Sequence, residues 1–495
     1  MCAYFCFASD PDLFFDTIPM TRATCGALFL VSWLSLLVCD AAGLPAPEPE
    51  RSVGHIVLQG PLKVLPTSPR YFVTPHGKPV YLNGSHTQLS LQDREGQPQL
   101  SFEFLLSFLQ EHRHNFTKLW MQEDTIHIPL PYQRIGPALA LDGKPKFDLT
   151  QLNPVYFDKL RSRAIDAENL GIYVGVMLFN GWSVESKEPN RHIWPRHPFN
   201  RANNVNNFDG DPNGDGEGAE VHTLSNPAIT AIQEAYVRKV IDSINDLDNV
   251  LYEISNEGAA TPENTTWQYH MIDFIHQYES TQPKQHPVGM TVQWPNGSNQ
   301  VLYESPADWI SPNSDEGHNI NPPASNHGKV VLNDTDHLWG NGGNAVWVWK
   351  SFTRGLNPIF MDLTTPLSQQ YTLPQADEIR VAMGDTLEYA KRIDLEKMEP
   401  RQDMCSTTFC LVSPGREYLV YFPPTGWCSI PLVGWFSKCK FTVDLSKVEN
   451  TFTVEWFAPD TRERQYLGTA TGGGVRTFIP PFRGPSVLYL KAQQT

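Results

Sequence analysis

Basic residues are scarce in this chain. It has 38 lysines and arginines against 54 aspartates and glutamates, which gives a formal net charge of -16. Proteins that bind a phosphate backbone need an excess of positive charge, so the composition argues against a nucleic-acid partner and fits a soluble acidic protein. Low-complexity tracts are also lacking. A length of 495 residues exceeds one ordinary domain, so we expect two globular domains and a leader.

Long hydrophobic runs are nearly absent as well. The one clear run, residues 27–38, follows a basic residue and precedes the small residues 41–43. This order is typical of a secretory signal peptide, and the run is too short for a comfortable membrane span. We therefore predict that residues 1–43 are a leader, with Met20 as an alternative start. The mature protein is expected to be secreted, with no membrane span.

No cysteine occurs between Cys39 and Cys405. Four occur from Cys405 to the end of the chain. Four cysteines in a small region of a secreted protein suggest two disulfides. The local pairing joins Cys405 to Cys410 and Cys428 to Cys439; the two other pairings remain open. The C-x2-C spacing typical of zinc sites is missing, which makes zinc the less favoured reading.

Strand-like and helix-like segments alternate from residue 71 to residue 393, after a proline-rich linker at 44–50. About eight strands, each followed by a helix or loop, predict a (β/α)8 TIM barrel over residues 52–400. A doubly wound sheet is the competing fold, but no glycine-rich phosphate loop follows the first strand. The predicted helices cover residues 102–112, 158–170, 228–245, 267–279, 346–352 and 375–393.

The periodicity changes to two in the last part of the chain. Residues 417–422, 441–445, 451–457 and 486–491 read as strands that are separated by turns without helices. This pattern predicts a small antiparallel β-sandwich domain over residues 401–495.

The segment 249–258 reads as a buried strand that ends in Asn256 and Glu257. Polar groups at the carboxyl end of a barrel strand face the mouth, where barrel enzymes carry their chemistry. A surface strand with a polar turn is the alternative. By strand count, Glu257 closes the fourth strand of the barrel.

Glycoside hydrolysis needs two carboxyl groups that flank one bond. The seventh predicted strand, residues 329–337, carries Asp334 and Asp336, which alternate onto one face. Asp334 is the first choice as partner of Glu257 and Asp336 the second; loop capping or a salt bridge with Arg354 is the alternative for this pair. Other residues near strand ends are predicted to line the substrate pocket: His86, Gln122, Glu123, Trp294, His318, His337 and Trp339.

The acidic segment 209–220 fits the spacing of a calcium loop. Asp209, Asp211, Asn213 and Glu220 supply oxygens at suitable positions for one structural Ca²⁺. Pro212 and the absence of flanking helices favour a solvated acidic loop instead. No other cofactor is expected.

Two segments, 71–87 and 252–257, resemble the apiosidase-like glycoside hydrolases, and Asn256-Glu257 resembles the acid/base motif of the retaining barrel clan. The tail, 417–490, is similar to a collagen-binding-like domain often fused to them. The resemblance implies that Glu257 is the general acid/base and that Asn256 binds the sugar hydroxyl next to the anomeric carbon. The nucleophile, commonly glutamate in the clan, falls on an aspartate here. Because the aspartate side chain is shorter, two stereochemical outcomes stay open. Retention is typical of a carboxyl separation of ~5 Å, and inversion of a separation of ~6.5–9.5 Å.

These features predict a secreted glycoside hydrolase that acts on an oligosaccharide or polysaccharide. The resemblance suggests apiose in pectin as the sugar. The alternatives are a non-catalytic carbohydrate-binding protein and a matrix-adhesion protein that works through its tail, although no residue here shows collagen affinity.

Overall fold

The computed structural model describes residues 58–188, 192–424 and 439–493. The predicted leader, the proline-rich linker and Cys428 lie outside these ranges. Within them, no helix is both long and apolar enough to cross a membrane.

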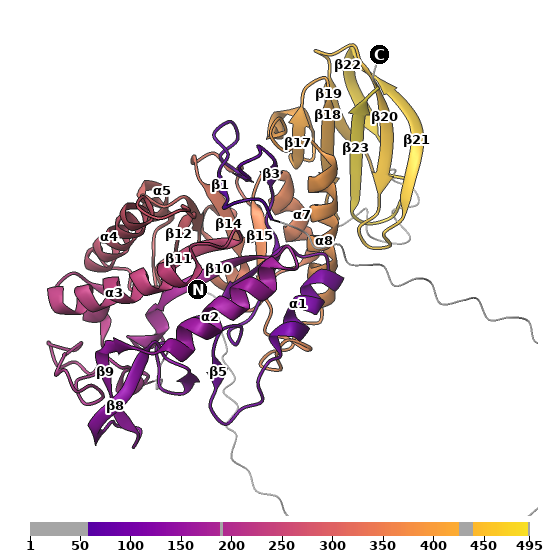
Figure 1. The fold of residues 1–495 in the computed structure, drawn as a ribbon. Coiled ribbons are helices and arrows are strands. Elements are labelled where there is room, and N and C mark those ends of the chain that lie inside the picture. The colour runs from indigo at the N-terminus through magenta and orange to yellow at the C-terminus, as the bar shows by residue number, and fades with distance from the viewer. Residues whose placement is uncertain (1–57, 189–191, 425–438, 494–495) are drawn as a thin grey trace, which may run out of the picture. The chain divides into compact units, whose positions relative to one another are not determined.

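Eight parallel strands form the predicted barrel (Figure 1), in the order β4-β15-β14-β13-β12-β11-β10-β6. Its two ends meet where the Asn115 amide donates to the Asn83 carbonyl at 3.0 Å. The predicted (β/α)8 barrel is therefore confirmed, with Glu257 after its fourth strand and Asp334 at the end of its seventh. The strands are β4 (Gly84–His86), β6 (Phe116–Leu119), β10 (Tyr173–Asn180), β11 (Val250–Asn256), β12 (Val288–Thr291), β13 (Trp309–Ser311), β14 (Val330–Asp334) and β15 (Asn357–Met361).

Helices follow the strands as the apolar patterns indicate, but several begin earlier than predicted. Asn153, Asn226 and Thr261 cap three of them with their side chains, and each is followed by proline. A capping side chain followed by proline at the first helical position is a strong start signal, so the fourth helix begins at Pro262 rather than at residue 267. The helices are α1 (Phe102–Glu111), α2 (Pro154–Glu168), α3 (Pro227–Ile244), α4 (Pro262–Glu279), α5 (Asn299–Glu304), α6 (Thr335–Trp339), α7 (Ala345–Thr353) and α8 (Ala376–Arg392).

The seventh strand is shorter than its sequence suggests. We predicted one strand over residues 329–337, with Asp334 and Asp336 on the same face. In the structure β14 ends at Asp334 and α6 begins at Thr335, because the Asp334 carboxylate accepts a hydrogen bond from the Asp336 amide at 3.0 Å. That part of the prediction is wrong: Asp334 ends a strand and Asp336 lies in the first turn of a helix.

Additional strands, which the sequence patterns did not indicate, lie between β6 and α2, on the side of the barrel where strand carboxyl ends emerge. β8 (Tyr132–Leu139) and β9 (Pro145–Leu152) form a hairpin, seen at the lower left of Figure 1. β7 (His127–Ile128) pairs with β5 (Asp93–Arg94). Ahead of the barrel, β1 (Lys63–Val64), β2 (Phe72–Val73) and β3 (Pro79–Val80) form a small antiparallel sheet.

Antiparallel sheets follow the barrel, as predicted. Six strands pair in the order β16-β17-β18-β23-β20-β21, and β19 pairs with β22. Phe441, Trp456 and Phe478 pack together between them. The strands are β16 (Glu399–Pro400), β17 (Cys410–Ser413), β18 (Glu417–Phe422), β19 (Phe441–Leu445), β20 (Thr451–Phe457), β21 (Arg464–Thr471), β22 (Gly474–Phe478) and β23 (Ser486–Ala492).

One predicted disulfide is not formed, and the other stays a prediction. Cys405 and Cys410 are buried free thiols, so the predicted bridge between them is not formed. The Cys410 thiol instead donates to the Arg401 carbonyl at 2.9 Å. Cys439 is disulfide-bonded, and its predicted partner, Cys428, lies outside the described residues.

One aromatic cluster joins the last barrel helices to the C-terminal sheet. Trp349 of α7 stacks on Tyr421 of β18, with ring centroids 5.9 Å apart, and also contacts Phe457 of β20. The Tyr389 hydroxyl of α8 donates to Glu455 at 2.9 Å. Because these side chains are buried together, we infer that the two parts stabilise each other.

Truncation of Trp349 tests this coupling. Trp349→Ala removes a buried indole from the shared cluster, so we expect a loss of about 3–5 kcal/mol of unfolding free energy. Urea unfolding followed by fluorescence and circular dichroism measures it, with Tyr466→Ala, at a side chain that is 70% exposed, as the control. The predicted result is one transition that moves as a whole. Two separate transitions, with that of the barrel at the same urea concentration as in the native protein, would contradict the coupling.

Candidate active site

Glu257 follows the last residue of β11 and adopts a left-handed backbone conformation, with φ of 45°. A nearby turn, η1 (Gly181–Ser183), approaches it so closely that a Cβ on Gly181 would lie 2.3 Å from the Glu257 carbonyl oxygen. The Trp182 indole N–H of this turn donates to the Glu257 carboxylate. Strained backbone of this kind is often found where a functional side chain must be aimed.

The environment of Glu257 favours its protonated form near neutral pH. Burial raises its pKa to about 7, against the opposing effects of the Trp182 hydrogen bond and the Lys187 charge. A carboxyl group with such a pKa can hold a proton at neutral pH and still release it to a substrate.

Asp336 is a second carboxyl group at the same mouth. It lies in the first turn of α6, after the seventh strand, and is 9% exposed. Neither of its carboxylate oxygens accepts a hydrogen bond from a described residue, and the nearest cation-forming group, His337 Nε2, is 3.7 Å from Oδ2. Burial and the nearby charges of Glu257 and Asp334 hold the pKa of Asp336 well above its usual range. Asp336 and Glu257 are therefore close enough to repel each other when both are ionised.

Asn256 is fixed by a hydrogen-bonded chain across the mouth. His337 Nε2–H donates to Asn256 Oδ1 at 3.1 Å, while His337 Nδ1 accepts from the Ser311 hydroxyl at 2.7 Å. Burial lowers the pKa of His337 to about 3, so the ring is neutral and these two roles are compatible. The Asn256 amide nitrogen keeps both hydrogens free of any described acceptor, and it can donate to a ligand.

A buried charge cluster lies below the two carboxyl groups. Lys118 Nζ is 2.9 Å from Asp334 Oδ2 and 3.1 Å from Glu253 Oε2. His86 Nε2–H donates to both oxygens of Asp334 at 3.0 Å, and its Nδ1 accepts from the Trp120 indole at 2.9 Å. Although burial opposes it, the hydrogen bonds from His86 and the charge of Lys118 hold the pKa of Asp334 well below its usual range.

Asp334 and His86 were predicted to act on the substrate, but these contacts indicate a supporting role. Both side chains are completely buried, and their polar atoms are engaged with each other, with Lys118, with Trp120 and with the start of α6. The structure therefore places Asp334 and His86 beneath the mouth as a support, whereas Asp336 offers free carboxylate oxygens.

Gln122 and Glu123, predicted to line the pocket, support the turn that carries Trp182. Asn180 donates from Nδ2 to Gln122 Oε1 at 2.8 Å, and its backbone amide donates to Glu123 at 2.8 Å. Glu123 is buried between His197 and His222, at 3.5 and 3.4 Å. Burial raises its pKa, but these histidines outweigh that effect and lower it to about 2.

The remaining predicted pocket residues divide into two groups. Trp294 lies at the mouth: its amide donates to the Gly258 carbonyl at 2.9 Å and its side chain is 43% exposed. His318 faces the helix layer, where its Nδ1 contacts Asn333 at 3.2 Å, and Trp339 packs edge-on against Trp347. Pocket roles for His318 and Trp339 stay predictions.

Trp182, Lys187 and Lys118 were not predicted from the sequence. Trp182 and Lys187 follow the third strand, and their position after a strand end is a signal that could have identified them. Lys118 lies inside an apolar strand, and a lone lysine there is a signal that its ammonium group has a buried partner.

The predicted calcium ligands of the acidic segment 209–220 contact other groups of the protein. Asp211 accepts from the amides of Gly214 and Gly216 at 2.8 and 3.0 Å. The Asn213 side-chain amide donates to Glu220, and Asp209 lies 3.8 Å from Arg201. Across residues 58–188, 192–424 and 439–493 no group of three or more His, Cys, Asp or Glu is arranged to hold a metal ion. Calcium binding at Asp209, Asp211, Asn213 and Glu220 stays a prediction.

Removal of the buried lysine tests the charge cluster. Lys118→Met leaves Glu253 and Asp334 without their shared cation, so we expect a loss of about 3–5 kcal/mol of unfolding free energy. Adding Glu253→Gln should restore part of it. Urea denaturation measures both, and Lys397→Met, at a 53% exposed side chain, should change stability by less than about 1 kcal/mol. Equal stability of Lys118→Met and the native protein would refute the cluster's role.

Comparisons with known proteins agree with this architecture. A model described as a domain of unknown function (DUF6298) matches residues 123–296, about a third of the chain. No curated protein matches. A solved structure described as a glycoside hydrolase is similar over 88% of this chain and 98% of its own, with a TM-score of 0.55 and 13% identity. A family 5 glycoside hydrolase from Bacteroides vulgatus is similar over 88% of this chain and 94% of its own, with a TM-score of 0.52 and 15% identity. At these identities the likeness shows the fold: this chain has the barrel that glycoside hydrolases use.

Proposed function

We propose that the protein is a glycoside hydrolase in which Glu257 and Asp336 flank the bond that is cleaved. The observation that carries this proposal is the pair itself. Two buried carboxyl groups follow the fourth and seventh strands, each with a pKa raised by burial, and the charge of Glu257 raises the pKa of Asp336 further. Glycoside hydrolysis requires a pair that holds one proton between two carboxyl groups.

The roles follow from the surroundings of each group. Glu257, with a pKa of about 7, donates its proton to the glycosidic oxygen as the bond to the anomeric carbon breaks. Asp336, with free oxygens, acts on the opposite side of the sugar. Asn256, held by His337, donates from its amide nitrogen to the adjacent hydroxyl. Asp334 is a positioning residue, because it fixes the first turn of α6 on which Asp336 lies.

Two stereochemical outcomes are compatible with this pair. Direct attack by Asp336 on the anomeric carbon gives a covalent intermediate and retention, whereas activation of a water molecule gives inversion. Proton NMR of the first-formed product anomer distinguishes them.

The substrate and the compartment belong to the same proposal. The exposed indole of Trp294 offers a flat apolar surface for a sugar face, which supports an oligosaccharide or polysaccharide substrate. Residues 1–43 support secretion. The resemblance to apiosidase-like hydrolases, which suggests apiose, and the collagen-binding-like tail stay predictions.

Substitution of the carboxyl groups tests the proposed roles. On whichever chromogenic glycoside or plant polysaccharide is turned over, Glu257→Gln and Asp336→Asn should each lower kcat/KM by about 10²–10⁴, the contribution of a positioned acid, base or nucleophile. Glu304→Gln, at an exposed carboxylate, is the matched control. Undiminished turnover by Glu257→Gln would refute the assignment. Tight sugar binding without turnover by the native protein would favour a non-catalytic carbohydrate-binding protein.

The pH profile gives a second test. Activity should fall at low pH, where both carboxyl groups of the pair hold a proton, and at high pH, where neither does. The Trp182 hydrogen bond stabilises ionised Glu257 and so lowers its pKa; Trp182→Phe should therefore shift the alkaline limb of kcat/KM to higher pH. An alkaline limb that stays in place or moves to lower pH would contradict this assignment.

A further inference from the structure

A polar cavity of about 590 Å³ lies at the barrel mouth, lined mostly by residues that follow the first three barrel strands. Gln88 comes two residues after β4, and Gln122 three residues after β6. Gln122 accepts from Asn180, whose side-chain oxygen accepts from the Trp182 amide at 3.1 Å. Since the Trp182 indole donates to Glu257, only two residues separate the cavity wall from the proposed acid.

Two arginines line this cavity, which we call the arginine cavity. Arg94 lies in β5, opposite His127 of the paired strand β7. Arg196 ends the short helix η2 (Trp194–Arg196). Both side chains are exposed, and neither guanidinium forms an ion pair with any residue that the structure describes. They are the two guanidinium groups of a cavity whose lining also includes the carboxyl groups of Asp124 and Glu188.

The acidic groups of the same cavity are already engaged. Asp124 is 5% exposed, and its Oδ1 accepts from His127 Nδ1 at 2.9 Å and from the Ile126 amide at 3.0 Å. Glu188 also has an interaction partner within the protein. The Asp124 carboxylate is therefore held by hydrogen bonds within the protein, while the Arg94 and Arg196 side chains donate to no residue that the structure describes.

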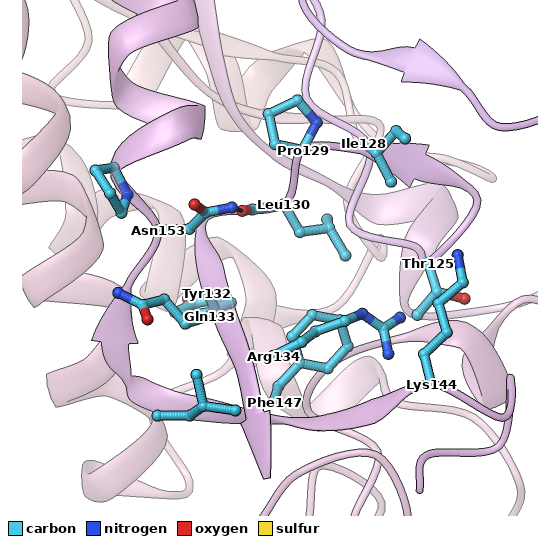
Figure 2. Close-up of a pocket in the computed structure, with 12 residues that line it drawn as sticks. Thr125, Ile128, Pro129, Leu130, Tyr132, Gln133, Arg134, Lys144, Phe147 and Asn153 are labelled. Atoms are coloured by element: carbon cyan, nitrogen blue, oxygen red, sulfur yellow. Dashed lines mark hydrogen bonds between the residues drawn. The ribbon is translucent and has the colours of Figure 1, made fainter.

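A neighbouring cavity shows the contrast. It has a volume of about 420 Å³ and lies beside the β8–β9 hairpin (Figure 2). Its Arg134 lies over the Phe147 ring at 4.0 Å and pairs with Asp142 at 2.5 Å, and its Lys144 pairs with Glu95 at 2.6 Å. Both cations of this cavity are paired, so it lacks the unpaired guanidinium groups that the arginine cavity offers.

We propose that the arginine cavity is a subsite for a negatively charged sugar residue, next to the bond that Glu257 and Asp336 cleave. The guanidinium forks match the planar oxygens of a uronate carboxylate and the oxygens of a sulfate ester. The amides of Gln88, Gln97 and Gln122 suit sugar hydroxyls. This inference rests on the proposed function and narrows it to an acidic saccharide as the substrate class.

Binding measurements test the subsite without relying on turnover. In the Glu257→Gln background, isothermal titration calorimetry compares oligogalacturonate with its carboxyl-reduced counterpart, and a sulfated galactan oligosaccharide with its desulfated counterpart. In one of the two pairs, the charged member should bind at least about tenfold more tightly than its neutral counterpart. The pair that shows this difference tells whether the subsite takes a carboxylate or a sulfate. Arg94→Gln and Arg196→Gln should each weaken that binding by about tenfold, as expected for one charge-assisted hydrogen bond.

The controls separate charge, folding and function. Arg483→Gln removes the same charge from an exposed arginine of the C-terminal region and should leave binding unchanged; Arg94→Lys should keep part of the selectivity. Melting temperatures check that each variant folds. No binding of either charged probe, equal binding of charged and neutral members, or insensitivity to both arginine substitutions overturns the subsite. Arginine-dependent binding with no hydrolysis by the native protein upholds the subsite and overturns the proposed function instead.

Discussion

The rest of the site depends on the ion pairs that the buried ammonium group of Lys118 forms. It lies between Asp334 and Glu253, at 2.9 and 3.1 Å, where all three side chains are almost completely shielded from solvent. A charge in such a place is stable only if its partners are fixed beside it. Lys118 therefore ties β6 to β11 and β14, the second, fourth and seventh strands of the barrel. It also keeps Asp334 ionised, and an ionised Asp334 can cap α6.

This buried cluster positions the polar groups at the mouth of the barrel. Asp334 sets the first turn of α6 and with it the position of Asp336, and His337 of the same helix holds Asn256. On the other side, the turn at Gly181 brings Trp182 against Glu257. Two carboxyl groups thus lie close to each other in a desolvated site, while a third carboxylate beneath them is fully paired. The same burial that costs stability for Glu257 and Asp336 raises their pKa values, which is what acid chemistry at neutral pH requires.

Much of the fold could be predicted from the sequence because it depends on local patterns. The eight strands and most helices follow from alternation and helical periodicity, and the strands of the C-terminal sheets follow from a period of two. The roles of Asp334 and Asp336 could not be separated in this way. A helix of five residues, α6, carries too short a pattern to be seen, so the capping contact that divides the two aspartates is visible only in three dimensions. Lys118 was missed for the same reason: its partners come from strands more than a hundred residues away. The Cys405–Cys410 bridge was predicted from spacing alone, and spacing does not determine whether two neighbouring thiols are bonded.

The sharing of one proton between Glu257 and Asp336 is the central claim, and the pKa of Glu257 tests it most directly. Carbon-13 NMR of side-chain carboxyl groups, with Glu257 assigned by comparison with Glu257→Gln, follows its titration without any substrate. The account predicts a midpoint near pH 7 in the native protein and a different midpoint in Asp336→Asn, where the coupled carboxyl group is gone. A midpoint at the ordinary value of a glutamate, about 4.3, or one that Asp336→Asn leaves unchanged, would contradict it.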